Sequence, residues 1–162
     1  MQENFRILIA GLFAAIVATT GCGEIGTWEE QERKQIDDYL KALGDTVYVL
    51  KPSGLYYIEL IEGTGVAPVE NDTVFFWYTG SFLDGVVFES NRSGTDPLRV
   101  ILGNNQLIEG IDEGVRYMKE GGKARLLTPS SLAYGHEGWW GIIPGYTPLV
   151  WTIDLVSVRP GP

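Results

Sequence analysis

One segment near the C-terminus limits the fold more than any other feature of the chain. In residues 148–158, "PLVWTIDLVSV", every second residue from Leu149 to Leu155 is apolar, whereas Thr152 and Asp154 lie between them. A period of two is typical of a strand with one buried face. Strand-like composition between turn residues recurs at 54–63, 73–80, 86–90 and 123–129, and "LDG" at 83–85 has the composition of a hairpin turn. The sequence therefore predicts an antiparallel sheet with one apolar face.

One short helix is expected among these strands. Residues 105–122, "NQLIEGIDEGVRYMKEGG", place apolar side chains at helical spacing and end in two glycines; the apolar members are Ile108, Ile111, Val115 and Met118. A helix packed across an antiparallel sheet gives an α+β domain. A chain of 162 residues has room for one such domain with extras, and we assign it to residues 53–162.

The first residues read as a targeting segment. Residues 7–17, "ILIAGLFAAIV", are too few to span a bilayer of about 30 Å at about 1.5 Å per residue, and they suit the core of a signal peptide. Cys22, the single cysteine, follows Gly21 as in the lipobox of bacterial lipoproteins. We therefore predict a signal peptide over residues 1–21 and export to the periplasmic side or the outer membrane, with Cys22 as lipid anchor. The alternative is an ordinary thiol beside a plain secretory cleavage site.

Residues 22–52 form a linker with a second helix. Thr27 and Glu30 have the spacing of a capping box, Gly44 supplies a stop, and an apolar stripe runs through Ile36, Tyr39, Leu40 and Leu43. The narrow stripe suits docking on the domain, pairing with a second copy, or a spacer from the membrane. Docking is the interpretation that the stripe favours.

Several function classes find no support in the sequence. The formal charge is −9, without a basic stripe, so nucleic acid is not an expected partner. His136 and Cys22 are the only histidine and cysteine, so no metal site is expected. Ser130 and Ser131 near His136 lack the G-x-S-x-G elbow of hydrolases, and "GCGEIG" follows a signal core rather than a strand. We assign His136 to a loop without catalytic duty.

The remaining aromatic and apolar motifs resemble those of a known protein family. The succession "FFWYTG", "LDGVVFES", "LIEGIDEGV", "LLTPSSLAYG" and "GIIPGYTPLVW", over residues 73–158, resembles the FKBP-type peptidyl-prolyl cis/trans isomerases. The resemblance implies a five- or six-stranded antiparallel sheet curled around one short helix, here with an N-terminal helical extension. It also implies an aromatic pocket that receives the proline ring of a substrate polypeptide, and no cofactor.

Carried over by motif, the resemblance implies a set of site residues. The catalytic members would be Tyr78, Phe88, Glu89 and Tyr134, with the Tyr134 hydroxyl donating to the bound peptide. Ile111 would form the floor of the pocket, and Ile142 and Ile143 its rim. The remaining substrate-binding members would be Leu98, Leu107, Ile108, Trp139 and Trp151.

Four positions depart from the family pattern. Glu89 replaces a usual aspartate, Ile111 replaces the tryptophan found at the floor of many members, and Leu98 stands where phenylalanine is frequent. Trp139 and Trp140 lie in the loop before "GIIPG", where they would cover the site or contact the residue before proline. We therefore expect weak isomerase activity on X-Pro bonds of exported proteins. The alternative is a membrane-tethered module that binds proline-containing peptides or acts as a chaperone with little or no turnover.

Overall fold

The computed structural model describes residues 27–139 and 141–161. The expected signal peptide, Cys22 and Trp140 lie outside these residues. The described elements are α1 (Trp28–Ala42), β1 (Val49–Leu50), β2 (Tyr56–Ile61), β3 (Thr73–Ser81), β4 (Val87–Ser90), β5 (Leu98–Ile101), α2 (Glu109–Arg116), β6 (Lys123–Thr128), the 3-10 turn η1 (Ser130–Leu132) and β7 (Leu149–Arg159).

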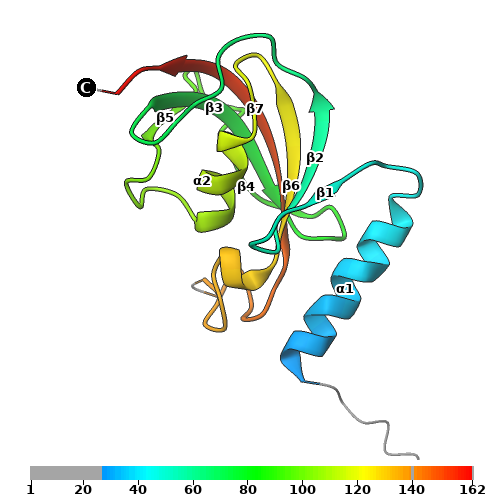
Figure 1. The fold of residues 1–162 in the computed structure, drawn as a ribbon. Helices are drawn as coiled ribbons and strands as arrows, with labels where there is room; N and C mark the ends of the chain where they lie inside the picture. Colours follow the sequence, from blue (N-terminus) through cyan, green and yellow to red (C-terminus); the bar gives the residue numbers. More distant parts are fainter. Residues whose placement is uncertain (1–26, 140, 162) are drawn as a thin grey trace, which may run out of the picture.

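All the strands join one antiparallel sheet in the order β1-β2-β6-β7-β3-β4, and β5 pairs with β3. The predicted α+β fold, an antiparallel sheet curled around one short helix, is confirmed (Figure 1). Two short strands, β1 and β5, bring the sheet to seven strands, beyond the five or six expected. Each is too short to show a period of its own in the sequence.

β7 is the strand that the alternation predicted, and it lies between β6 and β3 at the centre of the sheet. Its apolar residues Leu149, Trp151, Ile153 and Leu155 are all buried, whereas Thr152 and Asp154 are only partly covered. α2 packs on the same face through Ile111 and Val115, so this face and the helix enclose the core. The β3–β7 pairing extends from Thr73↔Arg159 to Ser81↔Val150 and fixes which residues face the helix.

α2 is shorter than its periodicity suggests. It ends at Arg116, with the backbone N–H of Tyr117 bonded to the carbonyls of Gly114 and Val115. Met118 is nevertheless buried, because the chain turns back to the sheet directly after the helix. A Cβ atom on Gly114 would collide with the side chain of Leu126, so glycine at this position allows α2 to lie close against β6.

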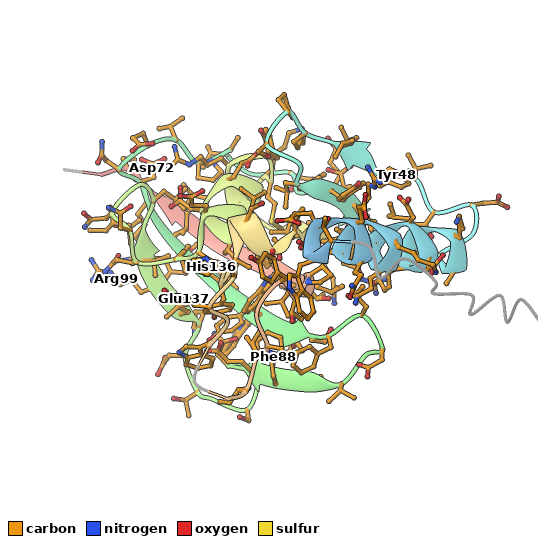
Figure 2. All side chains as sticks on the ribbon, turned by 90° about the horizontal axis from the view of Figure 1, so that it is seen from below. Tyr48, Asp72, Phe88, Arg99, His136 and Glu137 are labelled. Carbon is orange, nitrogen blue, oxygen red and sulfur yellow. The ribbon has the colours of Figure 1, made fainter. Side chains whose placement is uncertain are left out.

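α1 lies against the other face of the sheet (Figure 1). The capping box of Thr27 and Glu30 is present, and Ile36 packs on Leu127 and Val150 of β6 and β7. This is the docked arrangement that the stripe favoured. In the view from below, Tyr48 lies on the side of α1, and Asp72 and Arg99 lie at the opposite end (Figure 2). Neither α1 nor α2, the helices of the described part, is long and apolar enough to cross a bilayer.

Candidate functional site

A cavity of about 190 Å³ opens between the start of α2, the strands β3 and β4, and the loop after η1. Its lining consists of Phe76, Tyr78, Glu89, Leu98, Gln106, Leu107, Ile108, Ile111, Tyr134 and Trp151. Pockets for drug-sized ligands measure about 300–1,000 Å³. The cavity therefore suits a single small apolar group rather than a nucleotide or a large cofactor.

The floor of the cavity combines one aliphatic and one aromatic side chain. Ile111 projects from the first turn of α2, and Trp151 from near the start of β7; both are buried. A Cβ atom on Gly80 would lie 2.6 Å from Trp151 and 2.8 Å from Phe88, so glycine at this position is needed for the rings to pack over β3. Phe88 meets Trp151 edge-to-face with the ring centroids 5.3 Å apart, which is a favourable aromatic geometry. Phe88 therefore supports the floor from behind.

One polar contact crosses the apolar lining. The Tyr78 hydroxyl donates a hydrogen bond of 2.6 Å to Glu89 Oε1, so the extra methylene of glutamate still allows the contact. Burial, followed by this hydrogen bond to a carboxylate, raises the pKa of Tyr78 above its usual range. Tyr78 is thus held neutral, with its proton directed at Glu89.

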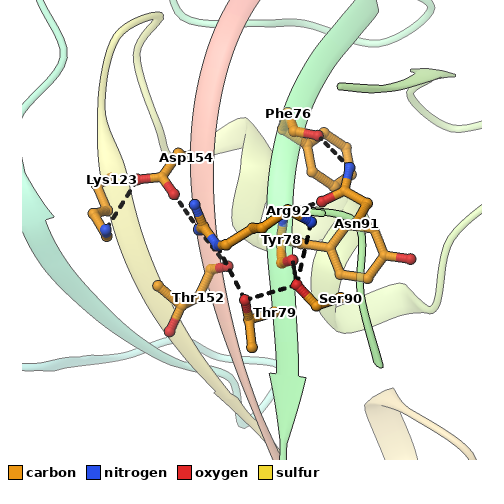
Figure 3. A network of polar contacts seen from close by, with 9 residues as sticks. All are labelled: Phe76, Tyr78, Thr79, Ser90, Asn91, Arg92, Lys123, Thr152 and Asp154. Carbon is orange, nitrogen blue, oxygen red and sulfur yellow. Dashed lines mark hydrogen bonds and ion pairs between the residues drawn. The ribbon is translucent and has the colours of Figure 1, made fainter. Parts of the chain in front are cut away.

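Asn91 fixes the backbone of Tyr78 (Figure 3). Where β3 exchanges β5 for β4 as its neighbour, the Asn91 side chain accepts from the Tyr78 backbone N–H at 2.7 Å and donates to the Phe76 carbonyl at 3.1 Å. The adjacent Arg92 donates to the Thr79 hydroxyl at 3.0 Å and forms an ion pair with Asp154 of β7. The Asn91 side chain therefore makes the hydrogen bonds to β3 that a neighbouring strand would otherwise make beside the cavity.

The opposite wall comes from the loop between η1 and β7. Tyr134 stacks on Trp139 with the ring centroids 5.7 Å apart and the planes 14° from parallel. Burial, and secondarily the nearby charge of Glu89, raises the pKa of Tyr134. No partner for its hydroxyl lies among the described residues, so this hydroxyl is available to a ligand in the cavity.

The residues expected at the site divide into two groups. Eight line the cavity: Tyr78, Glu89, Leu98, Leu107, Ile108, Ile111, Tyr134 and Trp151. Four do not: Phe88 lies behind Trp151, Trp139 covers Tyr134, Ile143 is buried in the core, and Ile142 is half exposed on the loop. Ile143 instead holds the loop, because its carbonyl accepts from the Trp139 N–H at 2.8 Å.

We did not predict from the sequence two residues of the cavity lining, Phe76 and Gln106, or the supporting residue Asn91. Phe76 precedes Tyr78 by two positions, so the period of the strand places both on one face, and this signal was available. Gln106 accepts from the backbone N–H of Ile101, and Asn91 accepts from that of Tyr78. Nothing in the sequence pattern distinguishes these two amides from ordinary loop residues.

The described residues hold no group of three or more histidine, cysteine, aspartate or glutamate side chains placed to bind a metal ion. The histidine, His136, lies in the η1–β7 loop with a largely exposed side chain, 3.8 Å from Glu137 (Figure 2). The cavity therefore offers apolar surface, the tyrosine–carboxylate pair of Tyr78 and Glu89, the Gln106 side chain and the Tyr134 phenol. This set can orient a carbonyl and exclude water.

Comparisons with known proteins agree with this geometry. Residues 65–156 match the family described as FKBP-type peptidyl-prolyl cis-trans isomerase. The macrophage infectivity potentiator of Trypanosoma cruzi is 32% identical over 95% of this chain and 82% of its own. An FK506-binding protein of Neisseria meningitidis is 39% identical over 65% of this chain and 96% of its own.

A solved structure has the same fold. The crystal structure of FkpA from Escherichia coli superposes with a TM-score of 0.72 at 34% identity, and the match covers 82% of this chain and 61% of that one. The chain therefore matches about three fifths of the FkpA chain in that crystal structure.

Proposed function

Since the chain belongs to the FKBP-type peptidyl-prolyl cis-trans isomerases, we propose that it acts on X-Pro bonds of exported polypeptides and lowers the rotation barrier with an apolar cavity. The observation that carries the proposal is the cavity of about 190 Å³ with Trp151 and Ile111 at its floor. At its edge lies the Tyr134 hydroxyl, for which residues 27–139 and 141–161 provide no hydrogen-bond partner. A proline ring is the side chain that such a cavity suits.

The physical basis is the resonance of the peptide bond. Rotation about the C–N bond costs about 18–20 kcal/mol, and X-Pro bonds isomerise in tens to hundreds of seconds without help. The twisted amide has lost most of this resonance and its charge separation. An environment without water therefore disfavours it less than it disfavours the planar amide. A barrier lower by about 5 kcal/mol corresponds to several thousand-fold in rate.

The two tyrosines have different roles in this proposal. Tyr78 already donates its proton to Glu89, so it serves as an oriented wall against the proline ring. The Tyr134 hydroxyl has no such partner among the described residues, and it donates to the carbonyl of the bound peptide. A hydrogen bond that is stronger in the twisted state than in the planar state adds to the rate.

Location is the second part of the proposal. The apolar run at residues 7–17 and Cys22 support export with a lipid anchor, on the periplasmic side or at the outer membrane. Replacement of Cys22 with serine should release the protein from the membrane fraction. Retention of the Cys22→Ser variant in that fraction would refute this anchor.

The alternative function is a tethered module that binds proline-containing segments without useful turnover. Ile111 favours it, because an aliphatic floor offers less surface to the proline ring than an indole would. Weakened ring contact lowers the binding energy that is available to stabilise the twisted state.

Exchange spectroscopy separates the two functions. Cis and trans signals of a short X-Pro peptide are followed by NMR with the wild type, with Phe88→Ala, and with Tyr48→Ala as control. Tyr48 is an aromatic residue directly before β1 and does not line the cavity. We expect the wild type and the control to speed exchange above the rate of the peptide alone, and Phe88→Ala to speed it less. Peptide binding without faster exchange would identify the binding module.

A further inference from the structure

A buried carboxylate lies on the inner face of α1. Trp28, Glu32 and Ile36 follow one another at i, i+4 and i+8, so they share the face that meets the domain. Ile36 packs on the sheet, and Glu32 is 9% exposed although its side chain is charged. Burial of a carboxylate is costly unless hydrogen bonds compensate for the lost water. A leucine at this position would bind the sheet without that cost, so docking alone gives no reason for glutamate.

Glu32 caps the turn that leads into the cavity wall. Its two carboxylate oxygens accept from the backbone N–H of Ser130 and, at 2.8 Å, from the Ser130 hydroxyl. Ser130 begins η1, and the residue at the cap position is Pro129, which provides no side-chain cap. The first N–H of a helical turn has no partner within the turn. Glu32 therefore supplies from another element the acceptor that Pro129 lacks.

The capped residue holds both neighbours of Tyr134. The Ser130 carbonyl accepts from the N–H of Ala133 at 2.9 Å and from the N–H of Gly135 at 2.8 Å. The backbone on each side of Tyr134 is thus tied to the residue that Glu32 binds. A shift of Ser130 would move the phenol that lines the cavity.

A second contact from α1 reaches the same loop. Trp28 stacks on Tyr146 with the ring centroids 5.8 Å apart and the planes 7° from parallel. The N–H of Tyr146 donates to the carbonyl of Gly135 at 2.9 Å. These two contacts of α1 therefore each lead to Gly135, directly after Tyr134.

We propose that Glu32 is a positioning residue for the isomerase reaction, and that α1 sets the place of the Tyr134 hydroxyl through the two hydrogen bonds that Ser130 donates to Glu32. The inference rests on the proposed function, because Tyr134 is the group that acts on the substrate. α1 is then part of the catalytic apparatus, although none of its residues lines the cavity.

Three variants of the full chain test this. Glu32→Leu keeps the helix docked and removes the cap, Glu32→Gln keeps an acceptor of the same length, and Glu29→Leu changes an exposed glutamate of the same helix as the control. A misplacement of about 1 Å costs up to about 100-fold in rate. We expect Glu32→Leu to lower kcat about tenfold with KM nearly unchanged, Glu32→Gln to restore most of kcat, and Glu29→Leu to match the wild type.

A double-mutant cycle with Tyr134→Phe identifies the route of the effect. If Glu32 acts through Tyr134, then Tyr134→Phe lowers kcat less in the Glu32→Leu background than in the wild type, by a factor of about two or more. Fully independent effects, or a Glu32→Leu variant with wild-type kcat, would overturn the proposal. If Glu32→Leu does not fold, Ser130→Ala in the same cycle removes the hydroxyl donor alone. A wild type without activity would instead refute the proposed function.

Discussion

Replacement of Tyr78 with phenylalanine removes the hydroxyl that donates to Glu89 at 2.6 Å and leaves the ring in place. A hydrogen bond to a charged group contributes about 1.5–3 kcal/mol to stability. Both side chains are only partly buried, so water solvates the abandoned carboxylate in part. We therefore expect the lower end of this range, a loss of about 1.5 kcal/mol in the free energy of unfolding. Glu89→Gln keeps a neutral acceptor, so we expect about half of that loss.

Urea unfolding measures both losses. With a slope of about 2 kcal/mol per molar urea, Tyr78→Phe should lower the midpoint by about 0.75 M and Glu89→Gln by about half as much. In the double variant the losses should not add, because both changes remove one contact. Tyr48→Phe, at a residue that directly precedes β1 and does not line the cavity, is the control. A Tyr78→Phe midpoint equal to that of the wild type would show that the hydrogen bond is not formed in solution.

Three further perturbations follow from the same region and from the core. Gly80→Ala should destabilise the protein by about 1–3 kcal/mol and slow X-Pro exchange, because the added methyl group displaces Trp151; an unchanged melting temperature would contradict this. Asn91→Ala should speed hydrogen exchange at the Tyr78 amide, which loses its acceptor, and an unchanged protection factor would refute the role of Asn91. Burial, with the charge of Glu59, raises the pKa of Tyr57 to about 12, against about 10 in an unfolded chain. The neutral phenol therefore stabilises the folded state fully below a pH of about 10, and this contribution is lost as the pH rises through about 12. Tyr57→Phe should reduce the fall in the free energy of unfolding between these pH values; an unchanged fall would contradict the role of Tyr57.

The sheet was predictable because a period of two is sustained over the buried half of a long strand, β7. β7 alternates over its buried half and packs against α2, whose apolar residues recur at helical spacing, and these two patterns together imply the α+β arrangement. β5 was missed because four residues pairing with β3 carry too little alternation to be seen. The end of α2 at Arg116 depends on backbone bonds of Tyr117 that composition does not report.

The cavity was predictable where two family motifs lie on paired strands, because the pairing brings their residues together. "WYTG" and "VVFES" lie on paired strands, so Tyr78 and Glu89 meet because Gly80↔Glu89 is a register pair. Glu32 is different, because it contacts Ser130 from 98 positions away in the sequence. The sequence offered one indication of this contact: Glu32 precedes Ile36 by one helical turn, so a charged residue lies on the apolar face of α1.

The two walls of the cavity differ in how they are fastened. Tyr78 belongs to β3, which is paired with β7 along its whole length, so this wall is lost only when the entire sheet melts. Tyr134 belongs to a loop that is held by a few backbone bonds and a carboxylate from α1, and segments of this kind open at lower free energy than the sheet. On warming, the protein should therefore stop turning over substrate while its circular dichroism is still that of the folded state. Heat inactivation and unfolding become two separate events in one small domain.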